Sequence, residues 1–143
     1  MPNVLFVCTH NSARSQMAEG LLRHLYGDHY TVYSAGTERT FVKPPATEAM
    51  RRAGIDISAH TSKTVEDVAD IEMDYVVTVC DSAREACPYV PSKRQTLHHS
   101  FWDPSNAEGD EEAKVQAFAQ VRDEIRDWII TTFHPNTGTL YRS

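Results

Sequence analysis

Val4-Leu5-Phe6-Val7-Cys8-Thr9-His10-Asn11-Ser12-Ala13-Arg14-Ser15 is the stretch of this 143-residue sequence that decides the fold. Its first four residues are consecutively apolar, as in a strand that is buried on both faces of a parallel sheet. Small and polar residues follow, and an apolar helical stripe comes next, formed by Met17, Leu21, Leu22 and Leu25. A loop between a strand and a helix aims backbone N–H groups and the positive end of the helix at one point. The sequence therefore predicts a cradle for a tetrahedral oxyanion.

Cys8 and Arg14 lie at the two ends of this loop. A cysteine beneath the bound anion is exposed to a field that favours the thiolate, and an arginine presents a planar fork of donors to two anion oxygens. We therefore expect Cys8 to be a nucleophile. The candidate oxyanion-binding residues are Thr9, His10, Asn11, Ser12, Ala13 and Arg14. The alternative is a buried cysteine at a strand end, followed by an N-capping Ser12 and a surface Arg14.

Strands alternate with helices along the rest of the chain. Strands are expected over residues 3–8, 30–35, 74–80 and 95–101, and helices over 12–26, 45–53, 65–71 and 111–132. This alternation predicts right-handed crossovers and a doubly wound α/β sheet, which binds ligands at the carboxyl ends of its strands. Cys8 and Cys80 each end such a strand. We expect one catalytic domain over residues 1–133 and a loosely ordered tail over 134–143.

Composition restricts the classes of partner. The formal charge of −6 gives no basic face for a nucleic acid, and no apolar run approaches the roughly 18 residues of a membrane span. The N-terminus lacks the features of a signal peptide, so we expect a cytoplasmic protein that binds neither nucleic acid nor membrane. The three cysteines are an odd number, which favours free or redox-active thiols over a static disulfide framework.

Several motifs, in order, resemble those of the low-molecular-weight tyrosine phosphatase fold, and most closely the thioredoxin-coupled arsenate reductases built on it. The resemblance covers nearly the whole chain, up to about Phe133. Its motifs are Cys8-Thr9-x-Asn11-Ser12-x-Arg14-Ser15-Gln16-Met17-Ala18-Glu19, Tyr33-Ser34-Ala35-Gly36, Asp56-Ile57-Ser58-x-His60-Thr61-Ser62, Val76-Val77-Thr78-x-Cys80, Cys87-Pro88, Trp102-Asp103-Pro104 and Val121-Arg122-Asp123-Glu124-Ile125. It implies a four-stranded parallel sheet in the order 2-1-3-4, with helices on both faces.

The resemblance also implies a relay of three thiols. Cys8 attacks arsenate, Cys80 attacks Cys8 so that arsenite leaves, and Cys87 attacks Cys80 to give a disulfide that thioredoxin reduces. In a continuous helix, residues seven apart are about 10 Å apart along the axis, whereas a disulfide spans a Cα separation of up to roughly 7 Å. The segment between Cys80 and Cys87 must therefore rearrange to form the bond.

Asp103 is the expected general acid, because the family places this group in such an Asp-Pro pair. Ser15 and Asn11 are expected to hydrogen-bond the thiolate and to fix the loop. Ser105 and Asn106 follow here, where the tyrosine phosphatases carry a tyrosine pair soon after their aspartate. This difference and the presence of Cys80 and Cys87 favour the reductase branch.

We therefore expect reduction of arsenate, with phosphate as an analogue, with thioredoxin as partner, with weak phosphatase activity and without a cofactor or metal. A zinc site at Cys80, Cys87, His98 and His99 lacks the close paired spacing of structural zinc sites. Two alternatives stay open. A tyrosine phosphatase would turn over without thioredoxin, and a non-enzymatic thiol redox or oxyanion sensor would not turn over at all.

Two positions depart from the family pattern. His10 stands where relatives often carry glycine, and direct catalysis by it is not expected. Relatives that bind potassium beside the loop use residues matching Asn11, Glu19 and Ser34 and a carboxylate where this chain has Lys63. An ammonium there can pair with Glu19 as a permanent cation, and potassium would then be both repelled and redundant.

Overall fold

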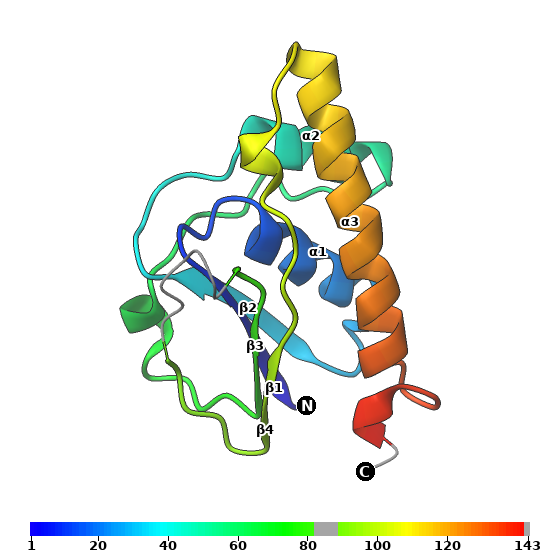
Figure 1. Ribbon diagram of the computed structural model, residues 1–143. Helices are drawn as coiled ribbons and strands as arrows, with labels where there is room; N and C mark the ends of the chain where they lie inside the picture. The colour runs from blue at the N-terminus through cyan, green and yellow to red at the C-terminus, as the bar shows by residue number, and fades with distance from the viewer. Residues whose placement is uncertain (82–88, 142–143) are drawn as a thin grey trace.

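A parallel four-stranded sheet forms the centre of the molecule, in the computed structural model that describes residues 1–81 and 89–141. Its strands are β1 (Asn3–Cys8), β2 (Thr31–Gly36), β3 (Tyr75–Thr78) and β4 (Gln95–His98). They lie in the order β2-β1-β3-β4 (Figure 1), which confirms the expected topology. The register places Cys8 opposite Gly36 and Val7 opposite Thr78, so the loops that follow β1, β2 and β3 meet at one edge.

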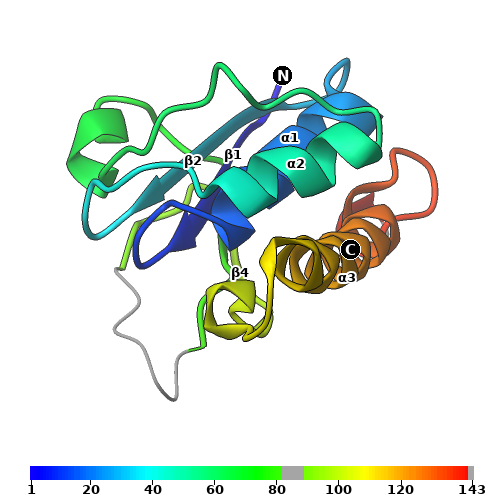
Figure 2. The same cartoon turned by 90° about the horizontal axis from the view of Figure 1, so that it is seen from above.

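Three α-helices cover one face of the sheet: α1 (Arg14–Tyr26), α2 (Pro44–Arg52) and α3 (Glu111–Phe133). The three helices lie together on one side of the strands in Figure 2. Because strand side chains alternate, Val4, Phe6 and Cys8 face these helices within the larger core cluster. Leu5 and Val7 face the other side, where they pack in a smaller cluster with residues on and near η1 (Val65–Val68). Helical turns thus cover both faces of the sheet, unevenly.

Several elements begin or end at other residues than the sequence predicts. The helix expected over 65–71 is the 3-10 turn η1, which is closed by a capping box between Thr64 and Asp67. β3 and β4 are shorter than expected, although Val79 N still donates to Val7 O at 3.0 Å and His99 N to Thr78 O at 3.0 Å. α1 begins at Arg14 instead of residue 12, because Ala13 at its N-cap has a non-helical backbone.

The chain between and beyond these elements adds η2 (Pro104–Asn106) before α3 and η3 (Thr139–Tyr141) after it. Leu140 packs, partly buried, against the larger core cluster. Among the helices of the described residues, none combines the length and the apolar character that crossing a bilayer needs.

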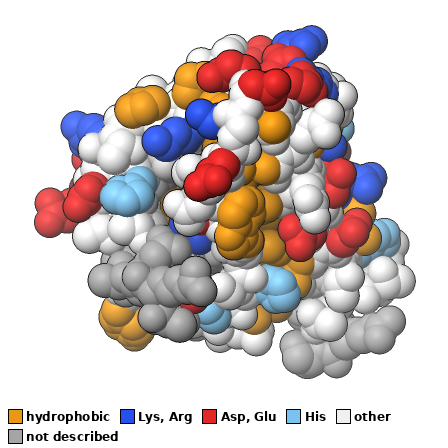
Figure 3. Space-filling model, turned by 45° about the horizontal axis from the view of Figure 1, so that its top comes forward, with side chains coloured by type: hydrophobic (Ala, Val, Ile, Leu, Met, Phe, Trp, Pro, Cys, Tyr) orange, Lys and Arg blue, Asp and Glu red, His pale blue; other side chains and the backbone are white. Residues whose placement is uncertain are grey.

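Charged side chains of both signs gather where α2 and α3 meet, toward the top of the face in Figure 3. Arg52 on α2 makes bonds of 2.9 Å to Glu48 and 2.7 Å to Glu112 on α3. Arg51 adds a second ion pair with Glu48, at 2.6 Å. This cluster ties the two helices together at the surface.

Candidate active site

Cys8 lies at the carboxyl end of β1, at the base of a pocket of about 340 Å³. It is a free thiol with 2% of its surface exposed. The pocket is lined by Cys8, His10, Ser12, Ala13, Arg14, Thr40, Phe41, Lys43, Asp103 and Ser105. Of the predicted oxyanion-binding residues, Thr9 and Asn11 do not line it. Asn11 is instead fully buried behind the loop.

Arg14 and Asp103 meet in this pocket. Nη2 of Arg14 lies 3.5 Å from Oδ2 of Asp103, and Nη1 donates to the carbonyl of Phe101 at 3.2 Å. The Arg14 side chain is 4% exposed and that of Asp103 is 26% exposed. Asp103 is also the N-cap of η2, where its Oδ1 accepts from Ser105 N at 3.0 Å. A buried guanidinium and a partly solvated carboxyl therefore face the same space as the thiol.

Three consecutive hydrogen bonds connect the backbone of Lys63 to Cys8 Sγ, through Asn11 and Ser15. The backbone N–H of Lys63 is an obligatory donor, and it donates to Asn11 Oδ1 at 2.7 Å. The amide nitrogen of Asn11 then donates to Ser15 Oγ at 2.9 Å. Ser15 Oγ lies 2.9 Å from Cys8 Sγ, and it has an O–H left to donate. The sulfur can therefore accept from Ser15, which is the role that a thiolate fills.

The loop also needs two special backbone positions. Asn11 has a φ of 48°, a left-handed conformation that asparagine tolerates better than most residues. Gly36, at the end of β2, lies against the loop so closely that a Cβ there would come within 2.7 Å of Thr9 O and 2.8 Å of Asn11 N. Only glycine fits at this approach.

The other two cysteines are placed differently. Cys80 is fully buried just beyond β3, the strand beside β1, so it follows the same edge of the sheet as Cys8. Cys87 lies outside the described residues. His98 Nδ1 lies 2.6 Å from Thr78 Oγ1, and His99 contacts the rings of Phe101 and Trp128. These two histidines are thus engaged elsewhere in the fold.

Glu19 has a different partner from the one expected. Arg23 Nη2 contacts its Oε2 at 2.6 Å, and the hydroxyl of Ser34 donates to its Oε1. Lys63 Nζ instead donates to the carbonyl of Thr61 at 2.8 Å. Arg23 therefore supplies the fixed cation that we had assigned to Lys63, because it lies one helical turn from Glu19 on α1. The Arg23 guanidinium thus already neutralises the carboxylate that matches a potassium ligand in the relatives that bind potassium.

Sequence reasoning did not single out Lys43, Phe41 and Thr40, which line the mouth of the pocket. Lys43 Nζ lies over the Phe41 ring, 5.1 Å from its centroid. The backbone N–H of Lys43 donates to Ser12 O at 2.9 Å, which ties the start of α2 to the loop. The position of Lys43 just before Pro44, at a predicted helix start, was the available signal.

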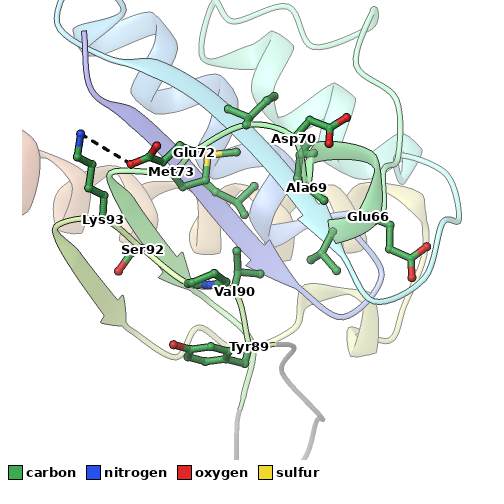
Figure 4. Close-up of a pocket in the computed structure, with 14 residues that line it drawn as sticks. Glu66, Ala69, Asp70, Glu72, Met73, Tyr89, Val90, Ser92 and Lys93 are labelled. Carbon is green, nitrogen blue, oxygen red and sulfur yellow. Dashed lines mark ion pairs between the residues drawn. The ribbon is translucent and has the colours of Figure 1, made fainter.

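A larger hollow, of about 660 Å³, lies on the face of the sheet that carries η1 (Figure 4). It is lined by residues 65–66, 68–73 and 89–93 together with Leu5. Lys93 pairs with Glu72 at 3.7 Å across one side. Within the part of the chain that the structure describes, none of the predicted catalytic residues lines it. The smaller pocket at Cys8 is therefore the candidate active site.

Known proteins resemble this chain over most of its length. An arsenate reductase of Halalkalibacterium halodurans is 48% identical over 122 residues, which cover 85% of this chain and 88% of that protein. The arsenate reductase of Bacillus subtilis is 45% identical over the same shares of the two chains. A solved arsenate reductase in a phosphate-binding state aligns with a TM-score of 0.71 at 30% identity, over 89% of this chain and 92% of that one.

A thioredoxin-dependent arsenate reductase of Corynebacterium glutamicum aligns with a TM-score of 0.63 at 30% identity, over 89% of this chain and 59% of that one. The model of the low molecular weight phosphotyrosine protein phosphatase family matches residues 3–134. The loop between β1 and α1, the strand order and this match agree, and the chain belongs to the low molecular weight phosphotyrosine protein phosphatase family.

Proposed function

We propose that this protein reduces arsenate to arsenite through Cys8, Cys80 and Cys87, and that thioredoxin regenerates the thiols. The observation that carries the proposal is the convergence of the Cys8 thiol, the Arg14 guanidinium and the Asp103 carboxyl on one pocket. The arsenate reductases that resemble the chain support the choice of arsenate over a phosphate ester. A pocket of about 340 Å³ has ample room for an inorganic oxyanion.

The first step joins Cys8 to arsenic. The thiolate attacks arsenate held by Arg14 and the loop, an S–As bond forms, and an As–O bond breaks. Asp103 supplies a proton, so the oxygen departs as water. Ser15 holds the attacking sulfur by its hydrogen bond. No organic cofactor or redox metal enters this step.

The remaining steps carry two electrons from thiols to arsenic. Cys80 attacks Cys8 Sγ, an S–S bond forms, and arsenic keeps the electron pair of the S–As bond and leaves as arsenite. Cys87 then attacks Cys80, which frees Cys8 and leaves a disulfide for the dithiol of thioredoxin to reduce. Such a relay belongs in a reducing compartment, and we place the protein in the cytoplasm.

Arsenite production with and without a thioredoxin system tests the proposal. We expect repeated turnover only when thioredoxin, its reductase and the nicotinamide reductant are all present. Hydrolysis of an aryl phosphate without thioredoxin, at a rate above that of arsenate reduction, would identify a phosphatase instead. Absence of turnover with either substrate would favour a sensor.

Single cysteine variants separate the steps. Cys8→Ser is expected to abolish both arsenate reduction and any aryl phosphatase activity, because the first bond to the substrate is lost. Cys80→Ser and Cys87→Ser are expected to abolish repeated reduction while phosphatase activity remains. Full thioredoxin-dependent turnover by Cys87→Ser would contradict the relay.

A further inference from the structure

A second cation besides Arg14 lines the pocket at Cys8. Lys43, the N-cap residue of α2, is half-buried and shares the mouth of the pocket with Thr40 and Phe41. Its Nζ lies over the ring of Phe41, 5.1 Å from the centroid. No step of the proposed reaction uses this ammonium group, although Lys43 lines the space that a bound oxyanion enters.

The backbone of Lys43 is fixed relative to the loop between β1 and α1. Its N–H donates to Ser12 O in that loop at 2.9 Å, and its carbonyl accepts from Ala46 N in α2 at 2.9 Å. Pro44 and Pro45 follow, and the ring of each proline restricts its own φ. The side chain of Lys43 does not cap the helix. A substitution that keeps a long, unbranched side chain should therefore leave the loop and the start of α2 in place.

The charge of Lys43 is not compensated by a carboxylate. Within residues 1–81 and 89–141, which the structure describes, Lys43 forms no ion pair, and its ammonium group contacts the ring of Phe41. An aromatic ring attracts an ammonium group through its quadrupole and does not neutralise it. Lys43 therefore leaves a positive charge at the mouth of the pocket. Other cations of the fold do pair with carboxylates, among them Arg14, Arg23, Arg39, Arg52 and Lys93.

The charges around Cys8 favour a further cation once an oxyanion is bound. The attacking thiolate is negative, and a tetrahedral oxyanion such as phosphate is a monoanion or a dianion near neutral pH. Arg14 brings one positive charge, and a carboxylate oxygen of Asp103 lies 3.5 Å from its Nη2. Negative charge therefore exceeds the charge of Arg14 in the complex. An ammonium group at the mouth lowers the free energy of that complex.

We propose that Lys43 is a specificity-determining residue, which gives the pocket at Cys8 a preference for doubly charged tetrahedral oxyanions over singly charged ones. Phe41 holds its ammonium group at the mouth. Coulomb energy is proportional to the product of the two charges, so Lys43 stabilises a bound dianion about twice as strongly as a monoanion of similar shape. For arsenate itself the proposal rests on the proposed function, whereas the preference among other oxyanions does not depend on it.

Sulfate and methanesulfonate test this preference, because both are tetrahedral at sulfur and stay doubly and singly charged, respectively, across the neutral range. Each anion is titrated against the rate at which iodoacetamide, a neutral reagent, alkylates Cys8. The reduced, full-length protein is used at constant ionic strength, so that screening stays the same. Peptide mapping by mass spectrometry follows Cys8 separately from the other thiols. The anion concentration that halves the rate gives the apparent Kd.

Lysine variants separate charge from shape. Lys43→Met removes the charge and keeps most of the length, and Lys43→Arg keeps the charge. Lys93→Met is the control, because Lys93 pairs with Glu72 at 3.7 Å on the other face of the sheet. In Lys43→Met, we expect the Kd of sulfate to rise about tenfold and that of methanesulfonate about threefold, as for unit charges about 6 Å apart in water. Lys43→Arg and Lys93→Met should bind both anions nearly as the wild type does.

Equal losses for the two anions in Lys43→Met would indicate a change of shape and would overturn the proposal. Unchanged sulfate binding in that variant would do the same. Phe41→Leu keeps Lys43 but removes the ring beneath its ammonium group, so sulfate binding should weaken by less than in Lys43→Met. Sulfate binding that does not change in Phe41→Leu would refute the role given to the ring.

Arsenate kinetics of the same proteins distinguish the two proposals. Lys43→Met is expected to raise KM for arsenate while kcat changes little, because Lys43 acts on the binding of the anion and not on the departing oxygen. If Lys43→Met loses the preference for sulfate but the wild type does not reduce arsenate, the role of Lys43 stands and the proposed function fails. Thioredoxin-dependent turnover together with an unchanged preference in Lys43→Met would have the opposite meaning.

Discussion

Asn11 combines a backbone role and a side-chain role in one residue. Its left-handed φ of 48° turns the loop, while its amide accepts from Lys63 N and donates to Ser15. Glycine supplies the first role without the second. Aspartate keeps the acceptor but replaces the donor to Ser15 with a second acceptor, which would draw the Ser15 O–H away from Cys8.

The two substitutions at Asn11 should therefore differ in effect. Asn11→Gly is expected to lower kcat/KM for arsenate by about tenfold, as for one lost buried hydrogen bond, and Asn11→Asp to lower it further. Alkylation of Cys8 near neutral pH should follow the same order. A variant Asn11→Asp that is more active than Asn11→Gly would show that the direction of the Ser15 hydrogen bond does not matter.

The pair of Arg23 and Glu19 makes a prediction about cations. Because Arg23 already neutralises Glu19, exchanging potassium for sodium at constant ionic strength should leave arsenate turnover unchanged. Lys63→Asp should also leave it unchanged, since Arg23 remains in place. Arg23→Gln with Lys63→Asp is the variant in which a potassium response is expected. Clear activation of the wild type by potassium would refute the role given to Arg23.

At the scale of elements, the end of β2 shapes the loop that follows β1. A Cβ at Gly36 would meet backbone atoms of Thr9, Asn11 and Cys8 at 2.7–2.8 Å, and backbone cannot move aside as a flexible side chain can. Gly36→Ala is therefore expected to cost about 1–3 kcal/mol of stability and to raise KM for arsenate.

Gly54→Ala is the matched control for this prediction. Gly54 has a φ of 80° but no atom within 4 Å of the added Cβ, so alanine there strains only its own backbone. Stability should fall in both variants, whereas KM should change only for Gly36→Ala. An unchanged KM in Gly36→Ala would mean that the loop tolerates displacement. Thermal unfolding and steady-state kinetics measure the two effects.

The sequence predicts the centre of the sheet well because β1 and β3 are largely apolar, as strands buried on both faces are. Residues 3–8 form β1 as expected, and the order of the four strands follows from the family resemblance. Element ends are less predictable, since η1 is set by a single Thr64–Asp67 capping box. The hydrogen-bond contact of 3.0 Å between His60 Nδ1 and Gln16 Oε1 was not predictable either. It joins residues 44 positions apart, and nothing local specifies that pairing.

At the scale of the whole molecule, the helices pack against one another as well as against the sheet. Val115, Phe118 and Val121 on α3 are buried in the same core cluster as Ala46, Ala49 and Met50 on α2. Arg122 adds a hydrogen bond of 2.6 Å to the carbonyl of Ala49. Outside this apolar contact, Arg52 bridges Glu48 and Glu112 at the surface.

This bridge predicts how stability responds to acid. The hydrogen bond from Arg52 lowers the pKa of Glu112 from 4.5 to about 2, and bonds from Arg51 and Arg52 do the same for Glu48. A carboxyl whose pKa is lower in the folded state than in the unfolded state stabilises the fold at pH values above its unfolded-state pKa. That contribution is lost as the pH falls from 4.5 toward about 2.

Arg52→Gln removes the hydrogen bond that contributes most to the lowered pKa of Glu112. The variant should therefore have a lower thermal midpoint than the wild type near neutral pH. The difference should be only a few degrees, because the pair is exposed. The difference should shrink as the pH falls through the window from 4.5 to about 2, since the wild type loses the same interaction there. Arg39→Gln is the control. It removes the hydrogen bond that lowers the pKa of Asp67 to about 2, and so tests a pair outside the contact of α2 with α3. If the midpoint difference for Arg52→Gln stayed constant across that window, Arg52 would act through its packing against the helices and not through its charge.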